Sequence, residues 1–157
     1  MNTKLALSTT ILFAAILIFA GRNAEAKVAP CSLATPAEIG AALNTTFDGG
    51  NAPTPSTCEW REVTSGTAIF IVDVNTSNAA FYGNMKTEAS QVGRAKPVSG
   101  LGDDAFFLTA GNGVETSLYV KKGGFAFQVM ITGEKPLNEA QREANEQAIA
   151  AVIAKKL

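Results

Sequence analysis

The sequence predicts an α+β fold, with a single twisted antiparallel sheet of about five strands and helices mainly on one face. Short segments in which apolar and polar residues alternate follow one another across tight turns, and strands joined in this way pair antiparallel. Three other segments have the spacing and the capping residues of helices. The expected order along the chain is α-β-β-α-β-β-β-α.

The first 26 residues have the pattern of a secretory signal peptide and are excluded from this fold. Lys4 precedes an uncharged apolar run at 5–20. Ala24 and Ala26 then form an A-x-A cleavage site. We therefore expect residues 27–157 to form a single periplasmic or secreted domain, with no membrane attachment after cleavage.

Two kinds of membrane attachment are the alternatives. An uncleaved anchor is disfavoured because the apolar run has 16 residues, whereas a spanning helix needs about 20. A lipid anchor on Cys31 is disfavoured because Pro30 stands where a small residue normally precedes the modified cysteine. Cys31 also lies well past the apolar run.

Charge and composition exclude several function classes for residues 27–157. Without Lys4, Arg22 and Glu25, the chain keeps 11 basic and 13 acidic residues, a net charge of −2. This balance disfavours nucleic acid or an anionic membrane surface as a partner. The chain has no histidine, the usual general base of nucleophilic triads and a common zinc ligand. No metal or cofactor is therefore expected.

The chain has two cysteines, Cys31 and Cys58, and in an oxidising compartment such a pair is expected to form a disulfide. Their spacing is far from the C-x-x-C pattern, which disfavours a redox-active or metal-binding pair. The bridge would close a loop of 28 residues. On the chain-entropy account it would stabilise the fold by about 3.6 kcal/mol.

The first helix has clear start signals. Thr35 is the expected N-cap, Pro36 the first helical residue and Glu38 the glutamate of a capping box. Apolar residues at helical spacing follow, and the helix should end near residues 43–44. Residues 47–55 are predicted to be an irregular loop because they are rich in glycine and proline.

A β-hairpin should come next, with strands at 58–63 and 67–75 joined by a three-residue turn. The alternation of a strand places Cys58, Trp60 and Glu62 on one face. A helix from a cap at 76–78 to about residue 89 and a loop at 93–102 containing Pro97 are then expected. The remaining strands are predicted at 104–108, 117–121 and 125–131, with a tight hairpin turn at 122–124.

The final helix begins at a second capping box, formed by Asn138 and Gln141. A stripe of mostly small residues is predicted to pack close to the sheet: Ala140, Ala144, Ala148, Ala151 and Val152, with Ile149 and Ile153 beside it. Glu139, Glu143 and Glu146 lie toward the N-terminal half, where their charge complements the helix dipole.

Four motifs occur in order along residues 27–157: C-S-L-A-T-P-A-E-I at 31–39, C-E-W at 58–60, V-S-G-L-G-D-D-A-F-F at 98–107 and K-G-G at 122–124. Their order and spacing resemble a family of small exported bacterial domains. Some members of that family carry a signal peptide and others a lipid anchor. The resemblance implies the two-cysteine bridge and the α+β layout, and it implies no activity and no catalytic residues.

The loop at 100–104 is the most suggestive candidate site. Asp103 and Asp104 are adjacent carboxylates flanked by glycines and could help to hold calcium. Calcium needs six to eight oxygen ligands, however, and the alternating acids of an EF-hand are missing. The favoured interpretation is a turn into a strand, in which the glycines adopt positive φ and an aspartate accepts hydrogen bonds from the loop.

Two other groups of residues are candidate sites. Glu59, Arg61, Glu62 and Asp73 could gather on the hairpin, where cross-strand ion pairs are favoured over acid–base chemistry. Aromatic residues could line a pocket for a small apolar ligand, although such residues more often form the core. Among these aromatic residues we single out Trp60 as a candidate ligand contact.

The sequence therefore predicts an exported domain that is not an enzyme. We expect it to bind an unknown protein or a small apolar ligand, with Asp103, Asp104 and Trp60 as the candidate contacts. The alternative is a hydrolase that uses the carboxylates of the 100–104 loop.

Overall fold

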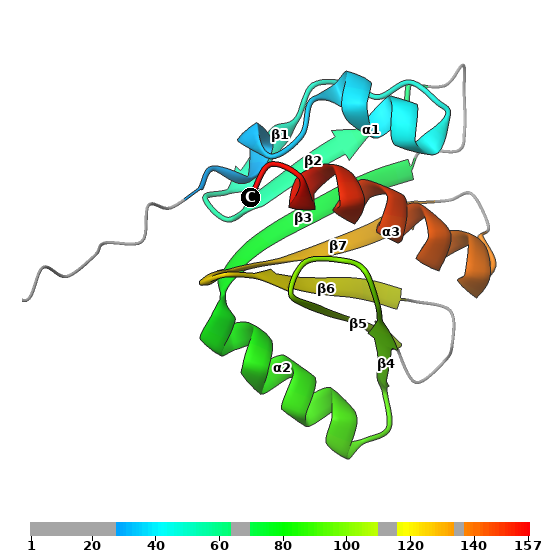
Figure 1. Ribbon diagram of the computed structural model, residues 1–157. Coiled ribbons are helices and arrows are strands. Elements are labelled where there is room, and N and C mark those ends of the chain that lie inside the picture. Colours follow the sequence, from blue (N-terminus) through cyan, green and yellow to red (C-terminus); the bar gives the residue numbers. More distant parts are fainter. Residues whose placement is uncertain (1–27, 64–69, 110–115, 134–136) are drawn as a thin grey trace, which may run out of the picture.

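The computed structural model describes residues 28–63, 70–109, 116–133 and 137–157. They form an α+β fold with one antiparallel sheet, as predicted, but the sheet has seven strands rather than five (Figure 1). The signal peptide expected at 1–26 and the turn expected at 64–66 lie outside the described residues. Among the described residues, no helix is both long and apolar enough to cross a membrane.

The elements have the following bounds. The strands are β1 (Asn51–Thr54), β2 (Thr57–Arg61), β3 (Phe70–Asn78), β4 (Ala95–Val98), β5 (Asp104–Thr109), β6 (Thr116–Lys122) and β7 (Phe125–Gly133). The helices are α1 (Pro36–Leu43), α2 (Ala79–Gln91) and α3 (Glu139–Ala154), preceded by a short 3-10 turn, η1 (Pro30–Ser32).

The strand order is β1-β2-β3-β7-β6-β5-β4, so two antiparallel groups meet at the contact between β3 and β7. That contact runs the full length of both strands, from Phe70 opposite Gly133 to Asn78 opposite Phe125. α2 connects the central strand β3 to β4. β4 lies at one edge of the sheet, and β1 lies at the other. The last four strands then return by hairpins until β7 reaches β3.

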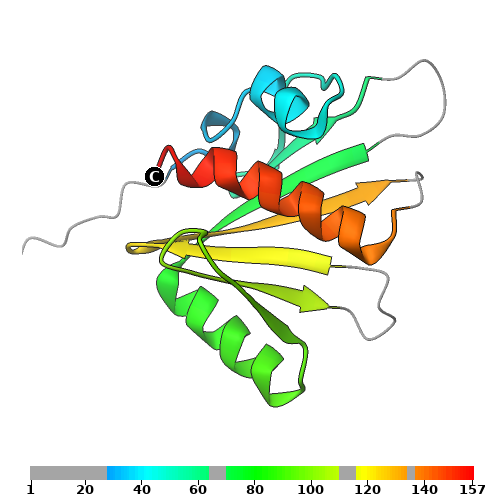
Figure 2. The ribbon, with the colours of Figure 1, turned by 45° about the vertical axis from the view of Figure 1, so that its right-hand side comes forward.

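The helices divide between the two faces of the sheet. α1 and α3 lie on one face, and α2 lies on the other (Figures 1 and 2). The larger core, under α1 and α3, contains Trp60, Phe107, Phe127, Ile149 and Ile153. A smaller core under α2 contains Tyr82, Phe106 and Tyr119. Because side chains alternate along a strand, Phe106 and Phe107 belong to different cores.

The predicted helix starts are present. The Thr35 side chain accepts a hydrogen bond from the Glu38 backbone N–H at 3.2 Å, and Glu38 Oε2 accepts one from the Thr35 backbone N–H at 2.8 Å. Asn138 and Gln141 form the same reciprocal pair at the start of α3. α1 ends at Asn44, which adopts the left-handed conformation at φ 55°. Such local pairs form between residues that are three apart, so the sequence alone can reveal them.

Two strands occupy segments that were predicted to be loops. β1 lies within 47–55 and contains Pro53, and β4 lies within 93–102 and contains Pro97. Both are edge strands, where one side of the backbone has no partner strand. A proline, which lacks an N–H, is tolerated at such a position and excluded from most central ones. The prediction was wrong because the sequence does not show which strands lie at an edge.

The start of α2 also shifts. β3 extends to Asn78, three residues beyond the predicted end, so Thr76 and Ser77 lie in the strand. Asn78 is the N-cap, and its side chain accepts a hydrogen bond from the Phe81 backbone N–H at 2.9 Å. The ladder with β7 provides backbone partners along this extension, which explains why the strand continues.

The predicted packing face of α3 is wrong. Its buried residues are Glu143, Glu146, Ile149, Ala150, Ile153 and Ala154, whereas Ala140 and Ala144 are exposed. The buried isoleucines were predicted beside the alanine stripe, but they lie at the centre of the face that contacts the sheet. Burial of two isoleucines removes more apolar area from water than burial of alanines. The helix therefore buries its isoleucines against the sheet. Glu143 and Glu146 lie on the same face and are buried with them.

Candidate functional site

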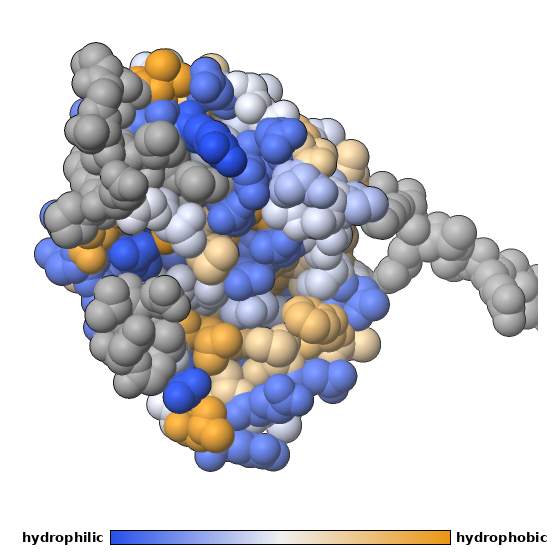
Figure 3. Space-filling view, turned by 180° about the vertical axis from the view of Figure 1, so that it is seen from behind, coloured by the Kyte–Doolittle hydropathy of each residue, from blue (hydrophilic) through white to orange (hydrophobic). Residues whose placement is uncertain are grey.

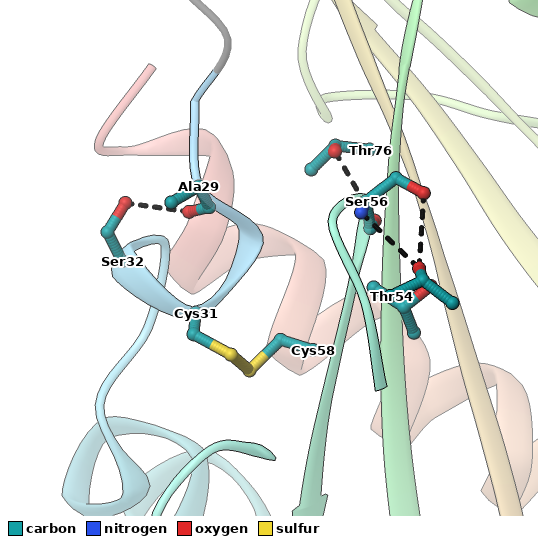
Figure 4. The surroundings of a disulfide bond; sticks show 8 residues. Ala29, Cys31, Ser32, Thr54, Ser56, Cys58 and Thr76 are labelled. Atoms are coloured by element: carbon teal, nitrogen blue, oxygen red, sulfur yellow. Dashed lines mark hydrogen bonds between the residues drawn. A yellow bond between two sulfur atoms is a disulfide. The ribbon is translucent and has the colours of Figure 1, made fainter. Parts of the chain in front are cut away.

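The predicted disulfide joins η1 to β2. Cys31 and Cys58 are bonded, with their Cα atoms 5.0 Å apart (Figure 4). The Ser32 hydroxyl donates to the Ala29 carbonyl oxygen at 2.7 Å and holds the turn that carries Cys31. Cys58 is fully buried. The bridge therefore fastens the segment that precedes α1 to the sheet and forms part of the larger core.

Trp60, a predicted ligand contact, lies in this same core. It is fully buried, two residues beyond Cys58 and on the same face of β2. The backbone of Gly50 covers both groups, because a Cβ at Gly50 would lie 2.7 Å from Cys58 Sγ and 3.0 Å from Trp60 Nε1. In this structure Trp60 therefore has no surface for a ligand.

Asp103 holds a turn. Its Oδ2 accepts a hydrogen bond from the Gly123 backbone N–H at 2.6 Å, in the hairpin between β6 and β7. Its own backbone N–H donates to the Lys121 carbonyl oxygen at 2.8 Å. Gly102, the residue before it, has φ +61° and lies directly against the Lys121 backbone. These contacts match the turn that was favoured for the 100–104 loop.

Gly102→Ala is expected to lower the free energy of unfolding by about 2 kcal/mol. A Cβ at this position would lie 2.4 Å from the Lys121 carbonyl oxygen, in addition to the cost of positive φ. Gly100→Ala is the matched control, since Gly100 has φ +77° and open space around it. It should cost about 1 kcal/mol, the price of the left-handed conformation alone. Urea denaturation of both variants measures the difference, and equal losses would contradict the predicted clash.

Asp104 points to the other face of the sheet, toward α2. Lys86 of α2 donates to both of its carboxylate oxygens, at 2.7 and 2.6 Å. Lys121 of β6 lies directly opposite Asp104 in the ladder and so on the same face. Lys121 forms no ion pair with another described residue. Asp104 is thus paired with Lys86, and Lys121 lies on the same face of the sheet.

These residues line a shallow groove beside α2, with a volume of about 530 Å³. We call it the α2 groove. Its lining residues are Ala79, Tyr82, Gly83, Lys86, Thr87, Ser90 and Gln91 of α2, with Asp104 of β5 and Lys121 of β6. A wider depression beside α1, of about 640 Å³, has no charged side chain among its lining residues, which are Pro36, Ala37, Gly40, Ala41, Asn44, Thr45, Thr46 and Phe47. The α2 groove therefore offers more polar chemistry.

Tyr82 supplies a buried hydroxyl to the α2 groove. The residue is 2% exposed, and its ring packs edge-on against Phe106 with the centroids 5.4 Å apart. The hydroxyl is buried beside the Asp104 carboxylate. Burial, followed by the Asp104 carboxylate, raises the pKa of Tyr82 far above its ordinary value. The phenol therefore stays protonated and remains a donor.

Asp104 is ionised at neutral pH. Burial on its own would raise the pKa of Asp104, but the Lys86 ammonium and the Tyr82 hydroxyl outweigh burial and lower the pKa. A carboxylate with a lowered pKa is a poor general acid. Its pairing with Lys86 suits it to positioning that lysine in the groove.

The charged residues predicted to gather on the hairpin divide between two faces. Glu59 and Asp73 lie opposite each other in the ladder, and Arg61 contacts Glu59 at 3.5 Å. Burial, and then the Glu59 carboxylate, raise the pKa of Asp73 to about 6 against the opposing effect of Arg61. Glu62 lies on the α1 side, where it accepts a hydrogen bond from the Thr45 hydroxyl at 2.7 Å.

Sequence reasoning missed a buried carboxyl group on α3. Glu146 is fully buried against β6 and β7, although it was predicted to complement the helix dipole. Burial raises the pKa of Glu146 to about 8, against smaller opposing effects of Ile131, Thr116 and Arg142. The signal was present in the sequence, because Glu146 lies three residues before Ile149 and seven before Ile153.

Comparison with protein-family models, curated proteins and solved structures finds no match for this chain. Within the described residues, no group of three or more histidine, cysteine, aspartate or glutamate side chains is placed to hold a metal ion. The geometry of the α2 groove is therefore the main basis on which a function can be proposed.

Proposed function

We propose that the chain is an exported, non-catalytic domain that binds an anionic partner in the α2 groove. One observation carries this proposal: two lysines, Lys86 of α2 and Lys121 of β6, line the groove, and Lys121 forms no ion pair with another described residue. Lys86 is paired with Asp104, which leaves the Lys121 ammonium to donate to a ligand. A carboxylate or phosphate group supplies the acceptor for such an ammonium.

The character of the described surface favours a polar partner over an apolar one. The exposed large hydrophobic residues are Val63, Phe81 and Val92. Seen from the side opposite to Figure 1, hydrophobic residues form separate patches and hydrophilic residues lie between them (Figure 3). The bulky aromatic residues Trp60, Phe106 and Phe127 are buried in the two cores and do not line a pocket for an apolar ligand.

Export is supported by the disulfide, because such bonds persist in oxidising compartments. The motifs behind the resemblance to small exported domains have structural roles in this chain. The cysteines form the bridge, Thr35 and Glu38 start α1, and Asp103 holds the turn at Gly123. A shared fold with a variable binding surface would fit such a family.

The hydrolase alternative has less support. Asp103 and Asp104 each have a structural partner, the Gly123 N–H and the Lys86 ammonium. The carboxyl groups with raised pKa values, Asp73 and Glu146, lie on other elements. A pair of carboxylates with separated pKa values at one site would be needed for acid–base chemistry.

Titration of the ¹⁵N-labelled domain with inorganic phosphate, citrate and a hexaglutamate peptide tests the proposed binding. We expect NMR shift changes confined to α2, Asp104 and Lys121 with at least one of these probes. Lys121→Gln should weaken that binding about tenfold, because a charge-assisted hydrogen bond is lost. Lys155→Gln, an exposed lysine in the cleft between α1 and α3, is the matched control and should have no effect.

Two outcomes would overturn the proposed site. One is the absence of shift changes with all three probes, and the other is an equal effect of the two lysine variants. Mass spectrometry of the protein purified from its native source tests export separately. It should show a chain that starts at Lys27 and is two mass units lighter than the reduced form, as one disulfide requires.

A further inference from the structure

Glu146 is a buried carboxyl group that forms no ion pair with another described residue. It lies on the α3 face that contacts the sheet, and its exposed fraction is 0%. Its Oε2 accepts from the Thr116 hydroxyl at 3.1 Å, and its Oε1 accepts from the Ile131 backbone N–H at 3.3 Å. Both donors are neutral and both distances are long for hydrogen bonds to a carboxylate. An ionised carboxylate in such a place would be poorly stabilised.

The described charged groups nearby have other contacts. Arg142, one turn earlier on α3, donates to the Ile131 carbonyl oxygen, and its Nε has no described hydrogen-bond partner. Glu143 is paired with Lys96 of β4 at 2.7 Å, so that ammonium is directed to Glu143. The charges of Arg142 and Glu143 act on Glu146 in opposite directions. The geometry and the electrostatics both favour the neutral carboxylic acid.

We propose that protonated Glu146 holds the N-terminal half of α3 against β6 and β7, and that loss of this proton in mildly alkaline solution loosens that half of the helix. The neutral acid fits the existing contacts, because the Thr116 hydroxyl can rotate and accept the proton of the acid along the same 3.1 Å line. Ionisation leaves a buried charge that must recruit Arg142 or reach water. Either outcome breaks a contact between α3 and the sheet.

The loosening should be local, because the C-terminal half of α3 is held independently. Ile149 and Ile153 are fully buried in the larger core. The Lys122 ammonium donates to the Ala154 carbonyl oxygen at 2.5 Å, and Lys156 is paired with Glu38 of α1 at 2.6 Å. None of these contacts involves Glu146. The proposal is independent of the α2 groove, which lies on the other face of the sheet.

The direction of the pH effect follows from the two pKa values of Glu146. The unfolded chain releases the proton near pH 4.5, and the folded chain keeps it up to about pH 8. Between these values only the folded state holds the proton, so stability falls as pH rises. The unfolding equilibrium constant should rise about tenfold per pH unit in this window.

The decisive measurement is urea denaturation from pH 7 to 8.5, a range in which Asp73 is almost fully ionised in both states. Wild type should lose stability across this range, and Glu146→Gln should remove that loss because its amide cannot ionise. Glu139→Gln, in the exposed first turn of the same helix, should behave as wild type. If Glu146→Gln keeps the wild-type pH dependence, the proposal is overturned.

Two measurements on the wild-type protein make the test independent of how well the variant folds. The ¹³C shift of the Glu146 carboxyl should titrate near pH 8, and titration near 4.5 would refute the proposal. Amide hydrogen exchange, corrected for its intrinsic pH dependence, should show protection of residues 142–147 falling above pH 8. Protection at residues 149–154 should persist, and a uniform loss along α3 would contradict the local loosening.

Discussion

Replacing Cys31 and Cys58 together by alanine is expected to lower the free energy of unfolding by about 3.6 kcal/mol. The bond closes a loop of 28 residues that begins within η1 and contains α1 and β1. Without it, the unfolded chain regains the conformational freedom that the loop removed. Cys58 is also fully buried beside Gly50, so the missing sulfur atoms leave a small void in the larger core.

Urea denaturation of the double variant and of wild-type protein in dithiothreitol measures this effect. The two should agree within about 1 kcal/mol, since both lack the bond and differ only in the sulfur atoms. The m-value should rise in both, because the unfolded chain without the cross-link exposes more surface. A loss below about 1 kcal/mol would show that the bridge is dispensable for this fold.

Trp60→Ala is expected to lower the free energy of unfolding by about 3–5 kcal/mol. Trp60 is among the largest fully buried side chains, and it packs in the core shared by Cys58, Ile39 and Phe47. Its removal leaves a cavity that the sheet and the disulfide prevent from collapsing. Thermal unfolding followed by circular dichroism measures the loss.

Trp60→Phe is the matched control for this variant. It keeps an aromatic ring in the core and should cost less than half as much as Trp60→Ala. The indole N–H has no described hydrogen-bond partner, so its removal leaves no new unsatisfied group. If Trp60→Ala kept wild-type stability and instead abolished binding of a partner, the assignment of Trp60 to the core would be wrong.

The two faces of the sheet separate stability from the proposed binding. The disulfide, Trp60 and Glu146 lie with α1 and α3, whereas Tyr82, Lys86 and Lys121 lie with α2. Variants on the first face should change stability and leave the affinity of the folded protein for anionic probes unchanged. Lys121→Gln should do the reverse, since Lys121 is partly exposed and forms no ion pair with the other described residues.

Local signals predicted most of the elements. The capping boxes at Thr35 and Asn138 were visible because their partners lie three residues away. The turn at Gly123 was visible because only glycine adopts its φ of +60° readily. The edge strands β1 and β4 were not predicted, because each contains a proline. A strand with a proline is tolerated mainly at the edge of a sheet, and the sequence does not show which strands lie there.

The candidate site was visible only in part. The adjacent acids Asp103 and Asp104 are candidate contacts by sequence. In the fold, however, they bind different partners, Gly123 and Lys86. Lys121 and Tyr82 have no sequence motif, and they meet Asp104 because β6 pairs with β5 and α2 packs on that face. These three residues are 17 to 39 positions apart in the sequence. The periodicities of helices and strands relate only residues a few positions apart, so they do not predict this contact.

The sequence by itself determined the α+β class, the cysteine pairing, the starts of α1 and α3 and the hairpin turn at Gly123, because each depends on neighbouring residues or on a choice between two cysteines. Only the tertiary structure decided the edge positions of β1 and β4 and the inward face of α3. An α-helix buries the face whose burial removes the most apolar area from water, summed over all its contacts. For α3 that face includes Ile149 and Ile153, and Glu146 is buried with them.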